Sequence, residues 1–306
     1  MSNYRIGIDL GGTKTEVILL DGNNNEYFRH RVPTVRDDYH GTIHSIGELV
    51  ARAESAAGET MLPVGVGIPG TISRKTGLVK NANSTWLNGQ PLQKDLSVFL
   101  MRDVKVTNDA NCLAVSEASD GAGRGYDLVF AGILGTGCGA GIAYRGKPIV
   151  GPNGVAGEWG HNPLPHLTDH ERAERPCYCG RAGCMELFLS GTGLGLTHQL
   201  ATQQPLNGHE IAELARSGDA PAIRTMDAYF DQLARGLASI INVMDPDVIV
   251  LGGGASNIDE IYTQMPQRLP EYVFGGECDT PVVKAVHGDS SGVRGAAWLN
   301  SLELHE

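Results

Sequence analysis

Three cysteines in the middle of the chain have the spacing of a metal site. Gly180 and Gly183 lie among Cys177, Cys179 and Cys184 and allow this short segment to turn tightly. Three converging thiolates need one further ligand, and Cys₃His is a closed tetrahedral arrangement of structural zinc. Disulfides are rare in the cytosol, where we expect this chain to remain. The spacing therefore predicts a zinc-binding knuckle rather than a disulfide or three free thiols.

Histidines upstream of the knuckle are the candidates for the fourth ligand. His161, His166 and His170 all lie within reach, although charged residues surround His170. Four protein ligands leave no open position for a water molecule. We therefore expect the metal to order the loop 152–186 and not to take part in chemistry.

Carboxylates next to predicted turns are the candidates for acid–base chemistry. Asp109 lies between a predicted strand, 104–106, and a predicted helix that begins at about Ala110. A carboxylate there could accept the proton of a substrate hydroxyl, but Asn108 or Asp109 could equally be the N-cap of the helix. Asp9 is a second carboxylate, beside a glycine-rich turn. Its expected role is to position magnesium, directly or through water.

Two glutamates flank the predicted metal site. Glu158 lies among glycines and a tryptophan, and Glu186 closely follows the last cysteine of the knuckle. Glutamates are usually solvated surface acids, but a metal knuckle would fix both side chains. Paired carboxylates are suitable acceptors for neighbouring hydroxyl groups of a sugar, so both are candidate binding residues.

Two glycine-rich turns, each between two apolar runs, could hold phosphate groups. The first is Gly11–Lys14, and much later in the chain Gly135–Gly137 has the same setting. Glycine lets consecutive N–H groups converge on phosphate oxygens, and a threonine in each turn adds a hydroxyl donor. One such turn alone would more simply be an ordinary hairpin. The repetition indicates two related halves, each with a phosphate-binding turn.

Neither turn has the context of the common nucleotide-binding fingerprints. A dinucleotide fingerprint ends a strand and opens a helix, whereas Gly135–Ala140 continues into a predicted strand and the match at Gly65–Gly70 contains Pro69. A P-loop needs glycine, lysine and serine or threonine in succession, but a threonine separates Gly12 from Lys14. The interpretation that is left is a pair of hairpin turns that bind phosphate.

Predicted strands and helices alternate along the chain and would position these groups. The predicted strands outside the two hairpins are 64–68, 104–106 and 247–251. The predicted helices are 110–119, 228–243 and one that opens at 252–254. Alternation of this kind is typical of an α/β fold with mixed sheets. The range 152–175 has little periodicity, and we expect an ordered loop there.

The charge balance excludes several kinds of partner. Lys and Arg number 24 against 35 Asp and Glu, a net charge of −11. Such a surface repels phosphate backbones and anionic lipids, so we expect neither nucleic acid nor a membrane as partner. Met1–Arg5 lacks the basic start of a secretory signal, and no stretch reaches the roughly 18 apolar residues of a membrane span. The sequence predicts a cytoplasmic protein.

These motifs together resemble the ROK family (repressors, open reading frames and kinases) of sugar kinases, over nearly the whole chain. The segments that carry the resemblance are Asp9-Leu10-Gly11-Gly12-Thr13-Lys14, Asn108-Asp109-Ala110-Asn111-Cys112, Gly135-Thr136-Gly137, Glu158-Trp159-Gly160-His161, Cys177-Tyr178-Cys179-Gly180, Gly183-Cys184-Met185-Glu186 and Leu251-Gly252-Gly253-Gly254. The resemblance implies a duplicated actin-like, ribonuclease-H-like ATPase fold, with two α/β domains around a cleft. Its implied domains are 1–120, joined by a C-terminal helix at about 290–306, and 121–289, which contains the zinc loop.

The same resemblance implies a role for each motif. It makes Asp109 the general base that acts on a sugar hydroxyl, and it selects His161 as the fourth zinc ligand. The implied ATP-binding residues are Asp9, Gly11, Gly12, Thr13, Lys14, Gly135, Thr136, Gly137, Gly253 and Gly254. The implied sugar contacts are Gly70, Asn83, Asn108, Asp109, Glu158, His161 and Glu186. The resemblance also implies ATP with Mg²⁺ and a hexose as substrates, Zn²⁺ as a structural ion, and a homodimer.

The choice of sugar depends on fewer residues. The segments 81–89, 157–165 and 275–278 look most like those of bacterial fructokinases that also accept mannose, so we expect D-fructose to become fructose 6-phosphate. N-acetylglucosamine or glucose kinases of the same family are the alternative. N-acetylglucosamine kinases share most motifs but look different around Trp86 and Trp159.

A sugar-responsive transcriptional regulator without catalysis is the alternative from another class. Family members of that kind carry a DNA-binding region before the first glycine turn, whereas only six residues precede Gly7 here. The net charge of −11 is also unfavourable for DNA. A sensor needs neither Asp109 nor two phosphate turns, so the sequence favours the kinase.

Overall fold

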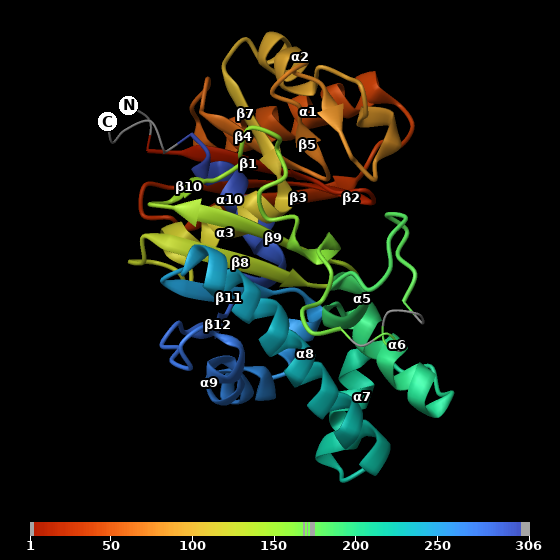
Figure 1. Ribbon diagram of the computed structural model, residues 1–306. Coiled ribbons are helices and arrows are strands. Elements are labelled where there is room, and N and C mark those ends of the chain that lie inside the picture. The colour runs from red at the N-terminus through yellow and green to blue at the C-terminus, as the bar shows by residue number, and fades with distance from the viewer. Residues whose placement is uncertain (1–2, 168, 170, 172–174, 301–306) are drawn as a thin grey trace. The chain divides into compact units, whose positions relative to one another are not determined.

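Two five-stranded sheets with the same strand pattern form the framework (Figure 1). The computed structural model describes residues 3–167, 169, 171 and 175–300. Their contacts divide the chain into two compact units. Of the described residues, the first unit contains 3–125, 141–156 and 289–300, and the second contains 126–140 and 157–288. The domain boundaries expected from the sequence stay a prediction.

The first sheet has the strand order β3-β2-β1-β4-β7. Its strands are β1 (Arg5–Leu10), β2 (Lys14–Leu20), β3 (Glu26–Pro33), β4 (Val64–Ile68) and β7 (Val104–Asn108). β1, β2 and β3 pair antiparallel, whereas β1, β4 and β7 pair parallel. β4 is buried at every position, as expected for a strand that is covered on both faces. The predicted hairpin around Gly11–Lys14 is confirmed.

The second sheet repeats this pattern with the order β10-β9-β8-β11-β12. Its strands are β8 (Leu128–Leu134), β9 (Cys138–Tyr144), β10 (Lys147–Pro148), β11 (Val248–Gly252) and β12 (Val282–Lys284). β8 occupies the place of β1, with parallel β11 beside it as β4 is beside β1. The duplication that the two glycine turns predicted is therefore present in the strand order.

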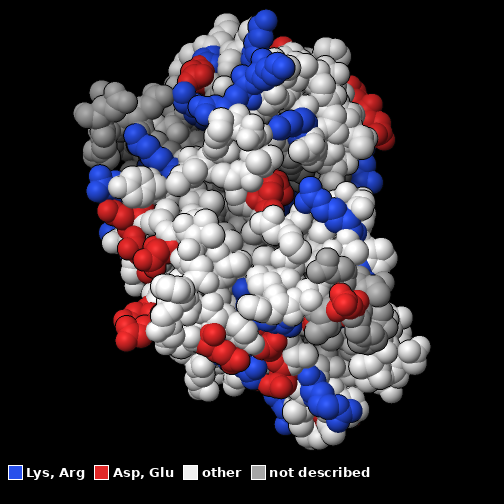
Figure 2. All heavy atoms as spheres, viewed as in Figure 1, with Lys and Arg blue, Asp and Glu red and all other residues white. Residues whose placement is uncertain are grey.

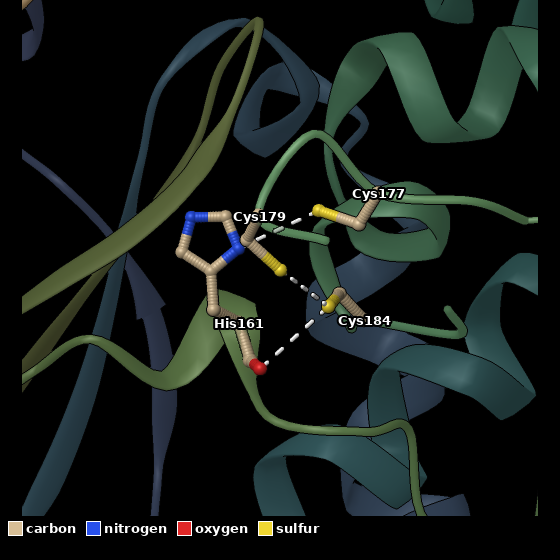
Figure 3. A group of neighbouring side chains, drawn as sticks. All are labelled: His161, Cys177, Cys179 and Cys184. Atoms are coloured by element: carbon tan, nitrogen blue, oxygen red, sulfur yellow. Dashed lines mark hydrogen bonds between the residues drawn. The ribbon is translucent and has the colours of Figure 1, made fainter. Parts of the chain in front are cut away.

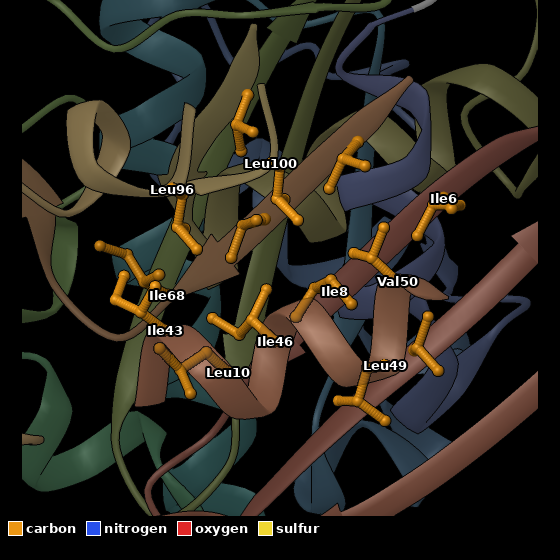
Figure 4. Packing of buried hydrophobic residues seen from close by; sticks show 14 of the residues in the cluster. Ile6, Ile8, Leu10, Ile43, Ile46, Leu49, Val50, Ile68, Leu96 and Leu100 are labelled. Carbon is orange, nitrogen blue, oxygen red and sulfur yellow. The ribbon is translucent and has the colours of Figure 1, made fainter. Parts of the chain in front are cut away.

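One face of the first sheet is packed by two helices. Helix α1 (Tyr39–Ala57) begins after Asp38, which accepts a hydrogen bond from Gly41 N, and it ends at Gly58 in the left-handed region. Helix α2 (Leu92–Phe99) joins the same core. The apolar side chains labelled in Figure 4 come from both helices and from the strands: Ile6, Ile8, Leu10, Ile43, Ile46, Leu49, Val50, Ile68, Leu96 and Leu100.

The opposite face is packed by α3 (Asp109–Asp120) and α10 (Ser291–Trp298). Successive side chains of β2 point to opposite faces of the sheet. Ile18 and Leu20 therefore pack with Val293 of α10, whereas Val17 and Leu19 belong to the core on the α1 face. Helix α10 lies close to the sheet because glycines occupy the strand positions that face it. A Cβ on Gly7 would lie 2.1 Å from the Val293 carbonyl oxygen, and one on Gly65 would lie 1.9 Å from the Ala296 carbonyl oxygen.

Replacing Gly65 with alanine is therefore expected to lower the free energy of unfolding by about 3 kcal/mol, because backbone atoms cannot rotate away from the new methyl group. Urea denaturation followed by circular dichroism measures this loss. Gly139 is the matched control, since no atom lies within 4 Å of its would-be Cβ. Equal stabilities of Gly65→Ala and the wild type would contradict the close packing of α10.

The first unit has a few further short elements, and the rest of the second unit is mostly helical. The first unit adds β5 (Thr71–Ile72), β6 (Val79–Lys80) and the 3₁₀ turn η1 (Thr85–Leu87). The second adds η2 (Trp159–His161), α5 (Glu186–Leu189), α6 (Gly191–Thr202), α7 (Gly208–Arg216), α8 (Ala220–Met244), η3 (Gly254–Asn257) and α9 (Glu260–Tyr272). A last 3₁₀ turn, η4 (Gly288–Ser290), precedes α10. Every helix of the described ranges is too short or too polar to cross a bilayer.

Several predicted boundaries are wrong for identifiable reasons. Helix α8 begins at Ala220, not at residue 228, because Asp219 caps it and Pro221 fits the first turn. The segment after β11 forms the turn η3 before α9, because Gly253 has φ +86° and cannot begin a helix. The C-terminal helix ends at Trp298, and residues 301–306 of the predicted range lie outside the described residues.

Candidate active site and metal centre

The structure gathers the predicted knuckle and one histidine into a single cluster (Figure 3). The ligand atoms of His161, Cys177, Cys179 and Cys184 all lie within 4.8 Å of one another. Cys177 Sγ is 3.7 Å from His161 Nδ1, and Cys179 Sγ is 3.6 Å from Cys184 Sγ. Zinc bonds of about 2.3 Å to sulfur place two tetrahedral ligands roughly 3.8 Å apart. The four residues therefore fit a tetrahedral zinc ion.

Of the two rival histidines, His166 lies outside this cluster. The His166 ring packs near Tyr272, with centroids 5.9 Å apart, and His170 lies outside the described residues. The other ring nitrogen of His161, Nε2, is 2.9 Å from the Tyr178 hydroxyl. That contact orients the ring as partners behind a metal ligand do. A sugar contact through His161 Nε2 would have to displace Tyr178, which is 83% exposed.

Asn108 and Asp109 lie together where β7 ends and α3 begins. Oδ1 of each accepts a hydrogen bond from Ala110 N, at 2.8 Å in both cases. Asn108 Nδ2 also donates to the Gly70 carbonyl oxygen at 3.1 Å. Asn108 Oδ1 would keep the Ala110 N–H group paired even without Asp109, so proton uptake by the exposed Asp109 carboxylate would not remove the helix cap.

The turn at Gly70 belongs to the same part of the first unit. Gly70 has φ +89°, and a Cβ there would lie 2.6 Å from the Lys80 carbonyl oxygen. The adjoining segment contains Asn83, which is exposed. Ser84 beside it faces the would-be Cβ of Gly12 at 3.8 Å. The first unit thus brings Gly70 directly to Asn108, and the Asn83 segment to the first glycine turn.

Asp9 is a partly buried carboxylate near the end of β1. Burial first, and then the charges of Asp109 and Glu16, raise the pKa of Asp9 to about 7. Its Oδ2 also lies 3.2 Å from the would-be Cβ of Gly292 in α10. Asp9 and Asp109 are therefore close enough to repel one another, and a bound cation would relieve that repulsion.

The pKa of Asp9 predicts a pH-dependent stability. An unfolded aspartate titrates near pH 4, so between about pH 4 and 7 the folded chain holds a proton that the unfolded chain has released. The wild type should lose stability as the pH rises through this window. Asp9→Asn should remove that loss and be more stable at pH 8 by about 2 kcal/mol.

Urea denaturation at pH 5, 6, 7 and 8, without nucleotide or divalent cations, measures the difference. Parallel pH curves for Asp9→Asn and the wild type would contradict this account of Asp9.

The first glycine turn, Gly11–Lys14, is held in shape from outside the turn. Thr34 Oγ1 donates to the Gly11 carbonyl oxygen at 2.7 Å, and Thr34 N donates to the Thr13 carbonyl oxygen. Arg36 Nε donates to the Gly12 carbonyl oxygen at 3.0 Å. Gly12, Thr13 and Lys14 are themselves exposed residues. Thr34 and Arg36 carry no signal in the sequence, because only the pairing of β2 with β3 brings them to the turn.

The second glycine turn, Gly135–Gly137, is held by three segments of the second unit. A Cβ on Gly253 would lie 2.6 Å from the Leu134 carbonyl carbon, so the two predicted ATP motifs are in contact. Gly191 N donates to the Gly135 carbonyl oxygen at 2.8 Å. The Glu186 carboxylate accepts from Cys138 N at 3.0 Å, while Glu158 is exposed. The structure thus joins Gly135–Gly137, Gly253 and Glu186 in one place.

Comparisons with known proteins identify the family of this chain. The model of the ROK family matches residues 5–302. The N-acetyl-D-glucosamine kinase of Escherichia coli O139:H28 (strain E24377A / ETEC) is 41% identical over 298 residues, which cover 96% of this chain and 98% of that protein. The crystal structure of a ROK hexokinase from Thermus thermophilus is similar with a TM-score of 0.86 and 30% identity, over 98% and 99% of the two chains.

A ROK family glucokinase from Streptomyces griseus, crystallised with glucose and AMPPNP, is similar with a TM-score of 0.74 and 28% identity, over 97% and 98% of the two chains. The expected α/β fold is confirmed by these likenesses and by the two sheets. The family match spans nearly the whole chain and includes every motif described above. This chain therefore belongs to the ROK family.

Proposed function

We propose that this ROK-family sugar kinase transfers the γ-phosphoryl group of ATP to N-acetyl-D-glucosamine. The observation that carries the choice of sugar is the 41% identity to an N-acetyl-D-glucosamine kinase along almost the full length of both chains. This supports the alternative sugar considered in the sequence analysis and leaves fructose without support. Identity to the glucokinase with bound glucose is lower, at 28%.

The two tryptophans whose surroundings look different from those of N-acetylglucosamine kinases have internal hydrogen-bond partners. Trp86 Nε1 donates to Thr42 Oγ1 at 3.1 Å, and Trp159 Nε1 donates to the Gly139 carbonyl oxygen at 2.8 Å. Trp159 is also only 2% exposed. Residues that pack in this way are poor evidence for the identity of a sugar, so their difference from N-acetylglucosamine kinases carries little weight.

The proposed reaction uses Asp109 as the base. The sugar hydroxyl gives its proton to the Asp109 carboxylate as its oxygen bonds to the γ-phosphorus, and the bond from that phosphorus to the bridging oxygen breaks to release ADP. Asn108 keeps the helix cap during this step, and its amide is fixed by Gly70. The helix cap would therefore persist while Asp109 takes up the proton.

ATP is proposed to bind through both glycine turns. Exposed groups of Gly11–Lys14 and the N–H groups of Gly135–Gly137 would hold phosphate oxygens, and Gly253 and Gly254 would lie near adenosine. A bound Mg²⁺ would supply positive charge to the transferring phosphoryl group. Asp9 fits a role beside it, because its raised pKa reflects burial and the nearby charges of Asp109 and Glu16, which a cation would offset.

The cysteine knuckle is proposed to hold Zn²⁺ as a structural ion. Four protein ligands leave no position for an activated water, so the ion would supply order rather than chemistry. Glu158 lies three residues before His161, and Glu186 lies two residues after Cys184. The knuckle would therefore fix both carboxylates as acceptors for sugar hydroxyls.

A coupled ADP-release assay tests the choice of sugar. With N-acetyl-D-glucosamine, D-fructose, D-mannose and D-glucose as acceptors, we expect kcat/KM for N-acetyl-D-glucosamine to exceed each of the others at least about tenfold. A sample without sugar gives the background of ATP hydrolysis. A larger kcat/KM for fructose would overturn the proposed substrate and leave the kinase assignment intact.

A regulator without catalysis has less support. The net charge of −11 opposes binding to DNA, and Figure 2 shows acidic and basic side chains on the same face of the molecule. No ADP release with any sugar, together with sugar binding by calorimetry, would favour the regulator over the kinase.

A further inference from the structure

Two hydrogen bonds join the second glycine turn to the segments that carry the metal ligands. The Glu186 carboxylate accepts from Cys138 N at 3.0 Å, and Trp159 Nε1 donates to the Gly139 carbonyl oxygen at 2.8 Å. These two backbone groups lie at the start of β9, directly after Gly135–Gly137. Glu186 thus fixes the N–H donor of Cys138, and Trp159 fixes the carbonyl acceptor of Gly139.

Each of these side chains lies two residues from a ligand of the cluster. Trp159 and His161 share the short turn η2, and Glu186 begins α5 just after Cys184. The two ligand segments are also tied together, because Met185 N donates to the Asn162 carbonyl oxygen at 2.9 Å. A displacement of either ligand therefore moves a residue that holds the turn.

Neighbouring residues pack closely around the Trp159 side chain and restrict its conformation. Its ring meets Phe130 edge to face with centroids 5.4 Å apart, and it is 2% exposed. A Cβ on Gly160 would lie 1.9 Å from the Cys138 carbonyl oxygen, so the backbone of η2 lies directly against the turn. On the other side, the would-be Cβ of Gly236 in α8 lies 3.5 Å from the Trp159 ring.

We propose that the metal centre positions the nucleotide-binding turn Gly135–Gly137 through Trp159 and Glu186, in addition to ordering the sugar-binding loop. The proposal rests on the proposed function in one respect, namely that this turn holds phosphates of ATP. Trp159 and Glu186 are positioning residues for the turn in this scheme. A metal that ordered only the sugar contacts would leave nucleotide affinity unchanged when no sugar is present.

The first test is calorimetric titration with a non-hydrolysable ATP analogue in the absence of sugar. Trp159→Phe keeps an aromatic ring but removes the donor to Gly139, and we expect affinity to fall roughly three- to tenfold. Removal of the metal from the wild type by a chelator, checked by elemental analysis, should produce a fall of at least the same size. Unchanged affinity in both samples would overturn the proposal.

Trp298→Phe is the matched control. It makes the same change of side chain in the first unit, where Trp298 Nε1 has no hydrogen-bond partner among the described residues. Its nucleotide affinity should stay within about twofold of the wild type. An equal loss in Trp159→Phe and Trp298→Phe would mean that a general destabilisation causes the effect, which contradicts the proposal.

Amide hydrogen exchange supplies a second readout that requires no ligand. Chelation and Trp159→Phe should each speed exchange in residues 134–140, while the first glycine turn, Gly11–Lys14, keeps its wild-type rates. Equal acceleration in both turns, or none in residues 134–140, would overturn the proposal. A wild type that shows this exchange pattern but binds no ATP analogue would contradict the proposed function and leave the coupling of metal and turn in place.

Discussion

Replacing Asp109 with asparagine is expected to lower kcat by roughly 10²–10⁴, the loss that follows removal of a general base. The two side chains have nearly the same shape, and an asparagine oxygen can still accept from Ala110 N. The fold and the start of α3 should therefore be preserved. Sugar affinity, measured by calorimetry, should change little, so the loss should be confined to kcat in a coupled ADP-release assay.

Asp103→Asn is the matched control for this change. Asp103 is an exposed carboxylate just before β7 whose ion partner is Lys105, and it has no proposed role in the reaction. The control should turn over at the wild-type rate. Near-normal kcat in Asp109→Asn would reduce Asp109 to a second cap of α3 and require another base.

Removal of the knuckle metal is the second change with a large expected effect. The wild type should contain about one zinc per chain by elemental analysis, and Cys179→Ser should contain almost none. We expect kcat/KM to fall by at least about 100-fold, because Glu158, Glu186 and Trp159 would lose their positions although none of them was changed. The melting temperature should also fall, since metal binding contributes folding free energy.

Cys278→Ser controls for the loss of a thiol. Cys278 is half-buried and lies outside the metal cluster, so its replacement should leave both the zinc content and kcat/KM unchanged. A metal-free preparation of the wild type with full activity would refute a structural role for zinc.

The parts of the fold that local patterns determine could be predicted from the sequence. Both glycine turns were predicted as hairpins because short apolar runs flank them, and their repetition anticipated the shared strand order of the two sheets. The cysteine spacing likewise predicted that Cys177, Cys179 and Cys184 lie together, because these residues are close in the sequence. The choice of His161 needed the family resemblance, since spacing alone left His166 and His170 open.

Features that depend on tertiary contacts were not predictable. Thr34 and Arg36 hold the first turn only because β3 pairs with β2, and Trp159 reaches Gly139 only once η2 has packed against β9. The prediction of fructose lacks support for a related reason. It was inferred from the segments 81–89, 157–165 and 275–278, and the distinction from N-acetylglucosamine kinases depended on the surroundings of Trp86 and Trp159. Both indoles donate hydrogen bonds within the protein.

The packing of α10 has a consequence for the order in which the chain folds during synthesis. Helix α10 completes the first unit by covering Ile18 and Leu20, yet the whole second unit is translated before it. At about 5–20 residues per second, the 163 residues between Gly125 and Asp289 (126–288) take roughly 8 to 33 s to emerge. During that interval this face of the first sheet has α3 but lacks α10, so the second unit has time to fold before the first is complete.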